Sequence, residues 1–368
     1  MIFTTCREPD ANGSAYAASI RRVAPHDSFG GLSMYQTGQA PDFSGLAASA
    51  LQHYALGPTT ATFVQHNAGI VFRVEAPTLG RTYLLKLHDR AGTGPNPTVE
   101  QLEAGLCWLA GLARGTGLTL QAPVATISGA FVCQIAGPER APIACTLQHW
   151  IAGKPPHGDF TAQHVRRIGA LLARLHAYSQ GHPVPADVPA TRHDADALAR
   201  NAGLLRTALD PVGLPPRSSA VLVATQEQIV AVMRQLGEAP AVWGAVHGDL
   251  HHDNLLFVGD AVVPIDFTGL RLAHYAYDLG VTLYHIFYQA PAIRHALLAG
   301  YQTVRGRPNM EPRVLEAFVT YAAIDNLAWN STIPEQLASP LFQRNLQQLV
   351  AMFCTHLAEG RPFLFRQL

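Results

Sequence analysis

His247-Gly248-Asp249-Leu250-His251-His252-Asp253-Asn254 is the stretch of this 368-residue chain that says most about its fold. Asp249 and Asn254 lie five positions apart, and a third polar residue, Asp266, follows Asn254 by twelve positions. The intervening residues 255–265 read as two short apolar strands joined by a glycine turn. A hairpin of this size returns Asp266 to the neighbourhood of Asn254, so three hard oxygen donors are expected close together.

These three side chains match what phosphoryl transfer from a nucleotide requires. One carboxylate orients an acceptor hydroxyl, while an amide and a second carboxylate hold Mg²⁺ beside the substrate phosphates. Asp249 and Asn254 have the separation of Asp and Asn in the catalytic-loop pattern His-Arg-Asp-Leu-x-x-x-Asn. We therefore predict that Asp249 is catalytic and that Asn254 and Asp266 are the Mg²⁺ ligands. His247 is predicted to support the catalytic loop.

The same histidine-rich stretch also fits a metal-dependent hydrolase. His247, His251, His252 and Asp253 offer nitrogen and oxygen donors for a transition metal. Such a centre needs further ligands from distant strand ends, and the sequence holds no Gly-Asn-His-Asp or His-Glu-x-x-His motif. The hydrolase is therefore the weaker alternative, and it stays open at this point.

Together with Tyr277-Asp278-Leu279, these motifs resemble those of the aminoglycoside phosphotransferase and choline kinase superfamily, and most closely the broad bacterial phosphotransferase enzyme family. The resemblance covers residues 47–330 and is sharpest over 244–280. It implies an α+β, two-lobed protein-kinase-like fold with a small β-rich N-lobe and a larger, mainly helical C-lobe. It also implies that ATP or GTP binds between the lobes. The γ-phosphoryl group would pass to a hydroxyl of a small molecule, as in aminoglycoside, homoserine and choline kinases. On this resemblance Asp278 is a buried residue that ties down the catalytic loop.

Changes of pattern along the chain indicate three parts. Residues 1–45 are rich in Gly, Ser, Ala and Pro, and we expect a partly flexible extension there. Residues 46–152 are expected to form the N-lobe, and residues 153–368 the helical C-lobe with the catalytic loop and the acceptor pocket. Apolar spacing predicts helices near 43–56, 98–112 and 161–178, and strands near 63–64, 70–74, 82–87, 130–135 and 143–150.

Several N-lobe residues are predicted to contact the nucleotide. The turn between the first two strands, through Asn67 and Gly69, is predicted to offer N–H groups to phosphate oxygens. Lys86 is an isolated lysine in the third apolar strand, and the resemblance makes it the residue that contacts the α- and β-phosphates. By the same resemblance, the carbonyl of His149 and the N–H of Ile151 contact the base. Ordinary turns explain both backbone sites equally well.

The acid that should pair with Lys86 is not where the family places it. In the helix predicted at 98–112, Gly105 stands at the family's glutamate position. We expect a one-residue shift of the helix that brings Glu103, or else Glu100, to Lys86 and the nucleotide. The alternative is a nucleotide-binding pseudokinase that lacks catalysis.

Composition limits the class of protein. The chain has 26 Lys and Arg and 26 Asp and Glu, so its formal net charge of zero makes no electrostatic case for nucleic acid or a membrane surface as partner. The apolar runs are too short to span a membrane, and the amino terminus lacks a signal-peptide pattern. Five scattered cysteines without Cys-x-x-Cys spacing indicate free thiols and a cytoplasmic location. The sequence does not indicate an oligomeric state.

Overall fold

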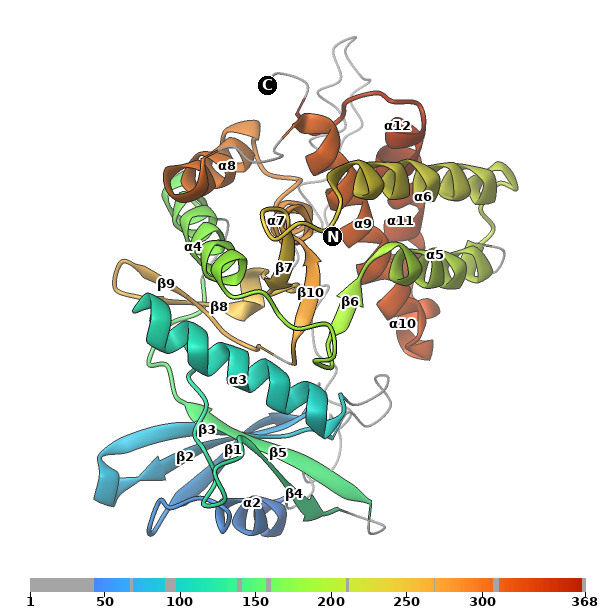
Figure 1. Cartoon of the computed structure of the whole chain (residues 1–368). Helices are drawn as coiled ribbons and strands as arrows, with labels where there is room; N and C mark the ends of the chain where they lie inside the picture. Colours follow the sequence, from blue (N-terminus) through green and yellow to red (C-terminus); the bar gives the residue numbers. More distant parts are fainter. Residues whose placement is uncertain are drawn as a thin grey trace, which may run out of the picture.

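A computed structural model of the protein describes residues 43–66, 69–89, 97–137, 141–156, 160–209, 212–267, 269–306 and 311–365. The extension predicted at residues 1–45 lies almost wholly outside these residues. The described chain has an antiparallel sheet in its N-terminal part and a helical C-terminal part (Figure 1). This arrangement confirms the predicted α+β class.

A five-stranded sheet forms the N-terminal part, with the strand order β1-β2-β3-β5-β4 and antiparallel pairing throughout. In β3, Leu85 and Leu87 are buried in the apolar core, and Lys86, which lies opposite Val71 of β2, is buried as well. Successive side chains of a strand point to opposite faces, so Lys86 projects from the face opposite to that of Leu85 and Leu87. The strands are β1 (Thr60–His66), β2 (Ile70–Ala76), β3 (Arg81–Leu87), β4 (Val132–Ala136) and β5 (Pro142–His149).

Two helices cover this sheet: α2 (Ser44–Leu51) lies on one side of it, and α3 (Val99–Thr116) lies on the side that faces the helical part (Figure 1). Thr98 starts α3 by accepting a hydrogen bond from the Gln101 N–H, and Gln101 returns a bond to the Thr98 N–H. This capping box satisfies two donors that a helix start leaves open. The buried face of α3 carries Leu102, Gly105, Leu106, Leu109 and Leu112.

Helices make up most of the C-terminal part, and α4 packs along α8 while α7 packs along α9. Their apolar faces enclose one large core that includes Leu172, Phe318 and Tyr321. None of the described helices is long and apolar enough to cross a membrane. The helices are α4 (Ala162–Gly181), α5 (Ala195–Leu209), α6 (Arg217–Leu236), α7 (Tyr275–His285), α8 (Pro291–Arg305), α9 (Pro312–Ser331), α10 (Pro334–Leu337), α11 (Pro340–Gln348) and α12 (Thr355–Ala358), with a π-helical stretch at Leu349–Cys354.

Two small sheets lie between these parts and carry the quoted motifs. Strand β10 (Arg271–His274) pairs with β6 (Thr191–His193) and with β7 (Trp243–Val246), whose end leads directly into the catalytic loop. Strands β8 (Leu255–Val258) and β9 (Ala261–Pro264) form the predicted hairpin. The prediction that this hairpin links Asn254 to Asp266 is therefore confirmed.

The chain segment that follows β5 is tied to the hairpin. Lys154 and Phe257 exchange two main-chain hydrogen bonds, of 3.0 and 2.8 Å. Gly153 lies so close that a Cβ atom there would be 2.8 Å from the Cβ of Leu256. The crossing from the sheet to the helical part is thus held against the strands that follow the catalytic loop.

Candidate active site

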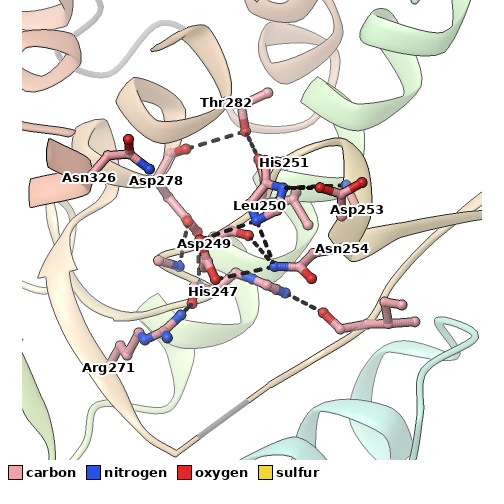
Figure 2. A network of polar contacts seen from close by, with 12 residues as sticks. His247, Asp249, Leu250, His251, Asp253, Asn254, Arg271, Asp278, Thr282 and Asn326 are labelled. Carbon is pink, nitrogen blue, oxygen red and sulfur yellow. Dashed lines mark hydrogen bonds and ion pairs between the residues drawn. The ribbon is translucent and has the colours of Figure 1, made fainter. Parts of the chain in front are cut away.

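Asp278, in the first turn of α7, holds the start of the catalytic loop, residues 247–254 (Figure 2). Its Oδ2 accepts a hydrogen bond from the His247 N–H at 3.0 Å, and its Oδ1 accepts one from the Gly248 N–H at 2.7 Å. His176 donates from Nε2 to the same carboxylate at 3.0 Å, and both side chains are fully buried. Burial acts to raise the pKa of the Asp278 carboxyl, but the bond from His176 and the other donors hold it below the usual value. The predicted supporting role of Asp278 is confirmed.

Three further bonds fix carbonyl groups around this loop. Arg271 donates to the carbonyl of His247 at 2.9 Å, and the Thr282 hydroxyl donates to the carbonyl of Leu250 at 2.9 Å. The Nε2 of His247 donates to the Ile265 carbonyl at 2.9 Å, which joins the loop to the end of the hairpin. Burial lowers the pKa of His247, so the neutral ring is favoured. The contacts of His247 are therefore those of a residue that supports the loop rather than one that reacts.

Asp249 and Asn254 meet within the catalytic loop (Figure 2). The Asn254 Nδ2 donates to the main-chain carbonyl of Asp249 at 2.8 Å and lies 3.2 Å from its Oδ2. This leaves the Asn254 Oδ1 without a hydrogen bond among the described residues, and an amide oxygen is a suitable ligand for Mg²⁺. The side chain of Asp249 is 44% exposed, so a hydroxyl group can reach its carboxylate.

Asp266 lies beside Asn254 because the N–H of Ile265 donates to the Asn254 carbonyl at 3.0 Å. Lys86 reaches across from β3, and its Nζ lies 2.7 Å from the Asp266 Oδ1. Burial acts to raise the pKa of Asp266, but the charge of Lys86 outweighs it and lowers the pKa to about 2. Asp266 is therefore ionised at neutral pH, and with Asn254 it offers the hard oxygen donors that Mg²⁺ prefers.

Gly69 lies against the predicted phosphate-binding lysine. Its φ is 132°, and a Cβ atom there would lie 2.8 Å from the Leu87 carbonyl oxygen and 3.3 Å from the Cε of Lys86. Only glycine adopts this conformation readily at such a close approach. Gly69, which directly precedes β2, thus lies against the Lys86 side chain. Asn67, the other predicted residue of the turn between β1 and β2, lies outside the described residues.

The predicted base-binding residues stand at the end of β5. The His149 N–H donates to the Ala122 carbonyl at 2.9 Å, and the Trp150 N–H donates to the Thr82 carbonyl at 3.1 Å. These bonds fix the backbone directly before Ile151. The contacts of His149 and Ile151 with a nucleotide base stay a prediction.

Glu103 does not pair with Lys86, and this prediction was wrong. Its carboxylate accepts hydrogen bonds from the N–H of Phe131, at 2.9 and 3.0 Å, and from the N–H of Val132 at 2.9 Å. Glu100 lies in the first turn of α3 at the protein surface. Lys86 takes Asp266 as its carboxylate partner instead.

Gly105 explains why no acid occupies the expected place. A Cβ atom on Gly105 would lie 2.5 Å from the carbonyl carbon of Gly269 and 2.7 Å from the nitrogen of Leu270. Helix α3 therefore packs its backbone directly on the segment that follows Asp266. Each residue turns a helix by about 100°, so Glu103, two positions earlier, points away from this contact toward β4.

The other histidines of the loop have partners of their own. The His251 ring stacks on His285 with 4.8 Å between ring centroids, and its Nδ1 accepts a bond from the Asp253 N–H at 3.3 Å. The His252 ring packs against Phe160 at 5.3 Å. Within the described part of the chain, no three His, Cys, Asp or Glu side chains gather in a metal-binding arrangement.

Sequence reasoning missed Gln121, which the structure brings to the predicted metal ligands. Its Oε1 accepts a hydrogen bond from the Asp266 N–H at 3.2 Å. Gln121 stands in the irregular segment between α3 and β4, where no periodicity or motif marks a residue for such a contact. Its burial, at 5% exposure, is the property that singles it out.

This fold, with Asp249, Asn254, Asp266 and Lys86 so placed, is that of a kinase-like phosphotransferase. The profile of the phosphotransferase enzyme family matches residues 62–313, and the chain belongs to that family. The homoserine kinase of Methylorubrum populi is 30% identical over 217 residues, which cover 57% of this chain and 62% of that enzyme. The homoserine kinase of Gluconacetobacter diazotrophicus is 28% identical over 304 residues, which cover 79% of this chain and 81% of that enzyme.

Solved structures share the fold over almost their full length. A microcompartment-associated aminopropanol kinase has a TM-score of 0.72 and 21% identity, and the match covers 87% of this chain and 99% of that one. Amicoumacin kinase, in complex with AMP-PNP, Ca²⁺ and Ami, has a TM-score of 0.67 and 17% identity, and the match covers 89% of this chain and 97% of that one. Both comparisons confirm the predicted kinase-like fold.

Proposed function

We propose that the protein transfers the γ-phosphoryl group of ATP or GTP, in the presence of Mg²⁺, to a hydroxyl group of a small molecule. One observation carries this proposal: the Asp249–Asn254 contact and the Lys86–Asp266 pair are joined through the main chain of residues 254 and 265. The nucleotide is proposed to bind between an N-lobe of residues 46–152 and a C-lobe of residues 153–368. A cytoplasmic location is proposed with it, because a kinase of this kind draws on the cellular nucleotide pool.

Asp249 is proposed to orient the acceptor hydroxyl and to accept its proton. A carboxylate is a weak base for an alcohol, so the proton passes late, as the bond to phosphorus forms. The hydrogen bonds that Asp278, Arg271 and Thr282 make to the loop fix the position of Asp249 before the acceptor arrives. Such preorganisation lowers the entropic cost of aligning the reacting groups.

Asn254 and Asp266 are proposed to hold the metal ion, through an amide oxygen and a carboxylate. A bound Mg²⁺ would neutralise charge on the phosphate oxygens. Lys86 is proposed to contact the α- and β-phosphates, and the turn with Asn67 and Gly69 to cover them. The backbone of His149 and Ile151 is proposed to contact the base.

An amino alcohol is the acceptor class that the comparisons support. Homoserine kinases are among the similar sequences, and an aminopropanol kinase is among the similar folds. Homoserine and aminopropanol each carry a hydroxyl and an amine within a few bonds of each other. We therefore propose a small amino alcohol as the acceptor ahead of a larger antibiotic.

The test is nucleotide turnover with ATP or GTP against homoserine, aminopropanol, choline and aminoglycosides. We expect Mg²⁺-dependent product with at least one amino alcohol. Asp249→Asn should abolish transfer while nucleotide affinity stays within a few-fold of wild type. Asp260→Asn is the matched control, since this side chain is 94% exposed in the hairpin turn. Nucleotide binding without turnover on any acceptor would instead support the pseudokinase alternative.

A further inference from the structure

The backbone of Asp266 is held in an unfavourable conformation. Among the described residues, Asp266 is the one non-glycine residue with a positive φ, at 64°. This left-handed conformation is costly for a residue with a Cβ atom, and it persists only where the surroundings impose it. The φ and ψ angles of Asp266 set the direction of its carboxylate, so whatever holds the backbone also aims the proposed metal ligand.

Gln121 supplies the hydrogen bond to the main-chain nitrogen of Asp266. The Gln121 Oε1 accepts from this N–H at 3.2 Å, across 145 positions of sequence. The neighbouring main chain is fixed as well, because the Ile265 N–H donates to Asn254 and the Ile265 carbonyl accepts from His247. Gln121 and His247 thus hold the peptide group directly before the Asp266 side chain, Gln121 at its N–H and His247 at its carbonyl.

Gln121 is itself anchored to β5. The Gln148 Nε2 donates to the Gln121 carbonyl at 3.1 Å, and both side chains are buried, with 6% and 5% exposure. The next residue, Ala122, accepts from the His149 N–H at 2.9 Å. The main chain of Gln121 is therefore joined to the strand that ends at the proposed base-binding segment.

We propose that Gln121 is a positioning residue that aims the Asp266 carboxylate for metal binding; this inference rests on the proposed function. A buried glutamine that only filled space would leave the Asp266 N–H to another acceptor. Here the side-chain amide oxygen of Gln121 accepts the hydrogen bond from the Asp266 N–H, while the main chain of Gln121 is fixed to β5. Loss of the acceptor therefore removes one of the two hydrogen bonds that hold the peptide group before Asp266, and it weakens the metal site before it weakens nucleotide contacts elsewhere.

Gln121→Met tests this, because methionine keeps the length of the side chain and removes the acceptor oxygen. The readout is calorimetric binding of ATP, with Mg²⁺ titrated and in EDTA. We expect the Mg²⁺ concentration for half-maximal enhancement of binding to rise roughly three- to tenfold, the equivalent of one lost hydrogen bond. Affinity in EDTA should stay within about twofold of wild type.

Gln121→Glu provides the rescue, because a glutamate offers an acceptor oxygen in either protonation state. Its Mg²⁺ requirement should lie nearer to wild type than that of Gln121→Met. Thr126→Val is the matched control: Thr126 is also buried in this segment, but among the described residues its hydroxyl bonds only Ser128 and Ala130. Gln121→Asn, which withdraws the acceptor by one methylene, makes the same test if the methionine variant does not fold.

Three outcomes overturn the inference, and they are distinguishable. If wild type binds ATP with a clear Mg²⁺ dependence and neither Gln121→Met nor Gln121→Asn shifts it beyond Thr126→Val, Gln121 has no positioning role. If wild type binds ATP with no Mg²⁺ dependence at all, the proposed function fails and the inference falls with it. An equal loss of affinity with Mg²⁺ and in EDTA also contradicts a role specific to the metal ligand.

Discussion

Gly105→Ala tests the close contact between α3 and the segment after Asp266. In a helix interior, Gly→Ala ordinarily stabilises a protein by about 1 kcal/mol. At Gly105 the added Cβ would stand 2.5 Å from the Gly269 carbonyl carbon, where carbon atoms normally keep about 3.5–4.0 Å. Because backbone stands on both sides of this contact, the helix must retreat, and overpacking of this kind costs up to about 3 kcal/mol. We expect a net loss of about 2 kcal/mol in the free energy of unfolding.

Gly203→Ala is the matched control, since Gly203 also lies inside a helix, α5. The nearest atom to a Cβ there is the Arg206 guanidinium nitrogen at 3.8 Å, an ordinary contact. This variant should gain up to about 1 kcal/mol, so the two substitutions should differ in sign. Urea unfolding followed by circular dichroism gives both values. If Gly105→Ala is as stable as Gly203→Ala, the close packing of α3 does not explain why Gly105 stands at the family's glutamate position.

Three further predictions concern other parts of the site. Asp278→Asn replaces one acceptor oxygen by a donor beside the His247 and Gly248 N–H groups, so the free energy of unfolding should fall by about 2–4 kcal/mol and turnover should fall with it. Stability and activity within error of wild type would contradict the role of Asp278 in supporting the catalytic loop. Glu103→Gln weakens the hydrogen bonds to the Phe131 and Val132 N–H groups, so it should cost about 1–2 kcal/mol of stability while nucleotide affinity stays within twofold of wild type. A tenfold loss of nucleotide affinity would instead favour an ion pair between Glu103 and Lys86. Burial lowers the pKa of His285 to about 3, so below pH 6.5 the unfolded chain binds a proton at this residue that the folded chain does not. The contribution of His285 to the free energy of unfolding should therefore be full above pH 6.5 and should fall by about 1 kcal/mol between pH 7.5 and 5.5. Urea unfolding curves that coincide at these two pH values would rule out this contribution.

Local features of the site were predictable from sequence, because spacing over a few residues fixes them. The hairpin between Asn254 and Asp266 has two short apolar strands joined by a glycine turn, so the return of the chain to Asn254 could be predicted from the sequence. Lys86 stood out as a single charge in an apolar strand. Strands β6, β7 and β10 were not predicted, since segments of three or four residues carry too little pattern when no glycine turn joins them to a neighbouring strand, as it does in the β8–β9 hairpin.

Contacts between distant segments were not predictable in the same way. A change of one residue turns a helical side chain by about 100°, so spacing alone could not say whether Glu103 faces Lys86 or β4. The packing of Gly105 on Gly269 depends on how the helix and the loop approach each other, which no single segment encodes. The same holds for Gln121, whose partner lies 145 positions away.

Helix α3 is held on two sides, by the Glu103 carboxylate at β4 and by the backbone contact of Gly105 with Gly269. In protein kinases that are switched on and off, the corresponding helix moves, and with it a glutamate that completes or breaks the site. Here the Glu103 carboxylate binds the main chain at β4, and outward movement of α3 would leave the Phe131 and Val132 N–H groups without this acceptor. We therefore expect a protein with no dormant state set by this helix, whose rate follows the supply of nucleotide and acceptor.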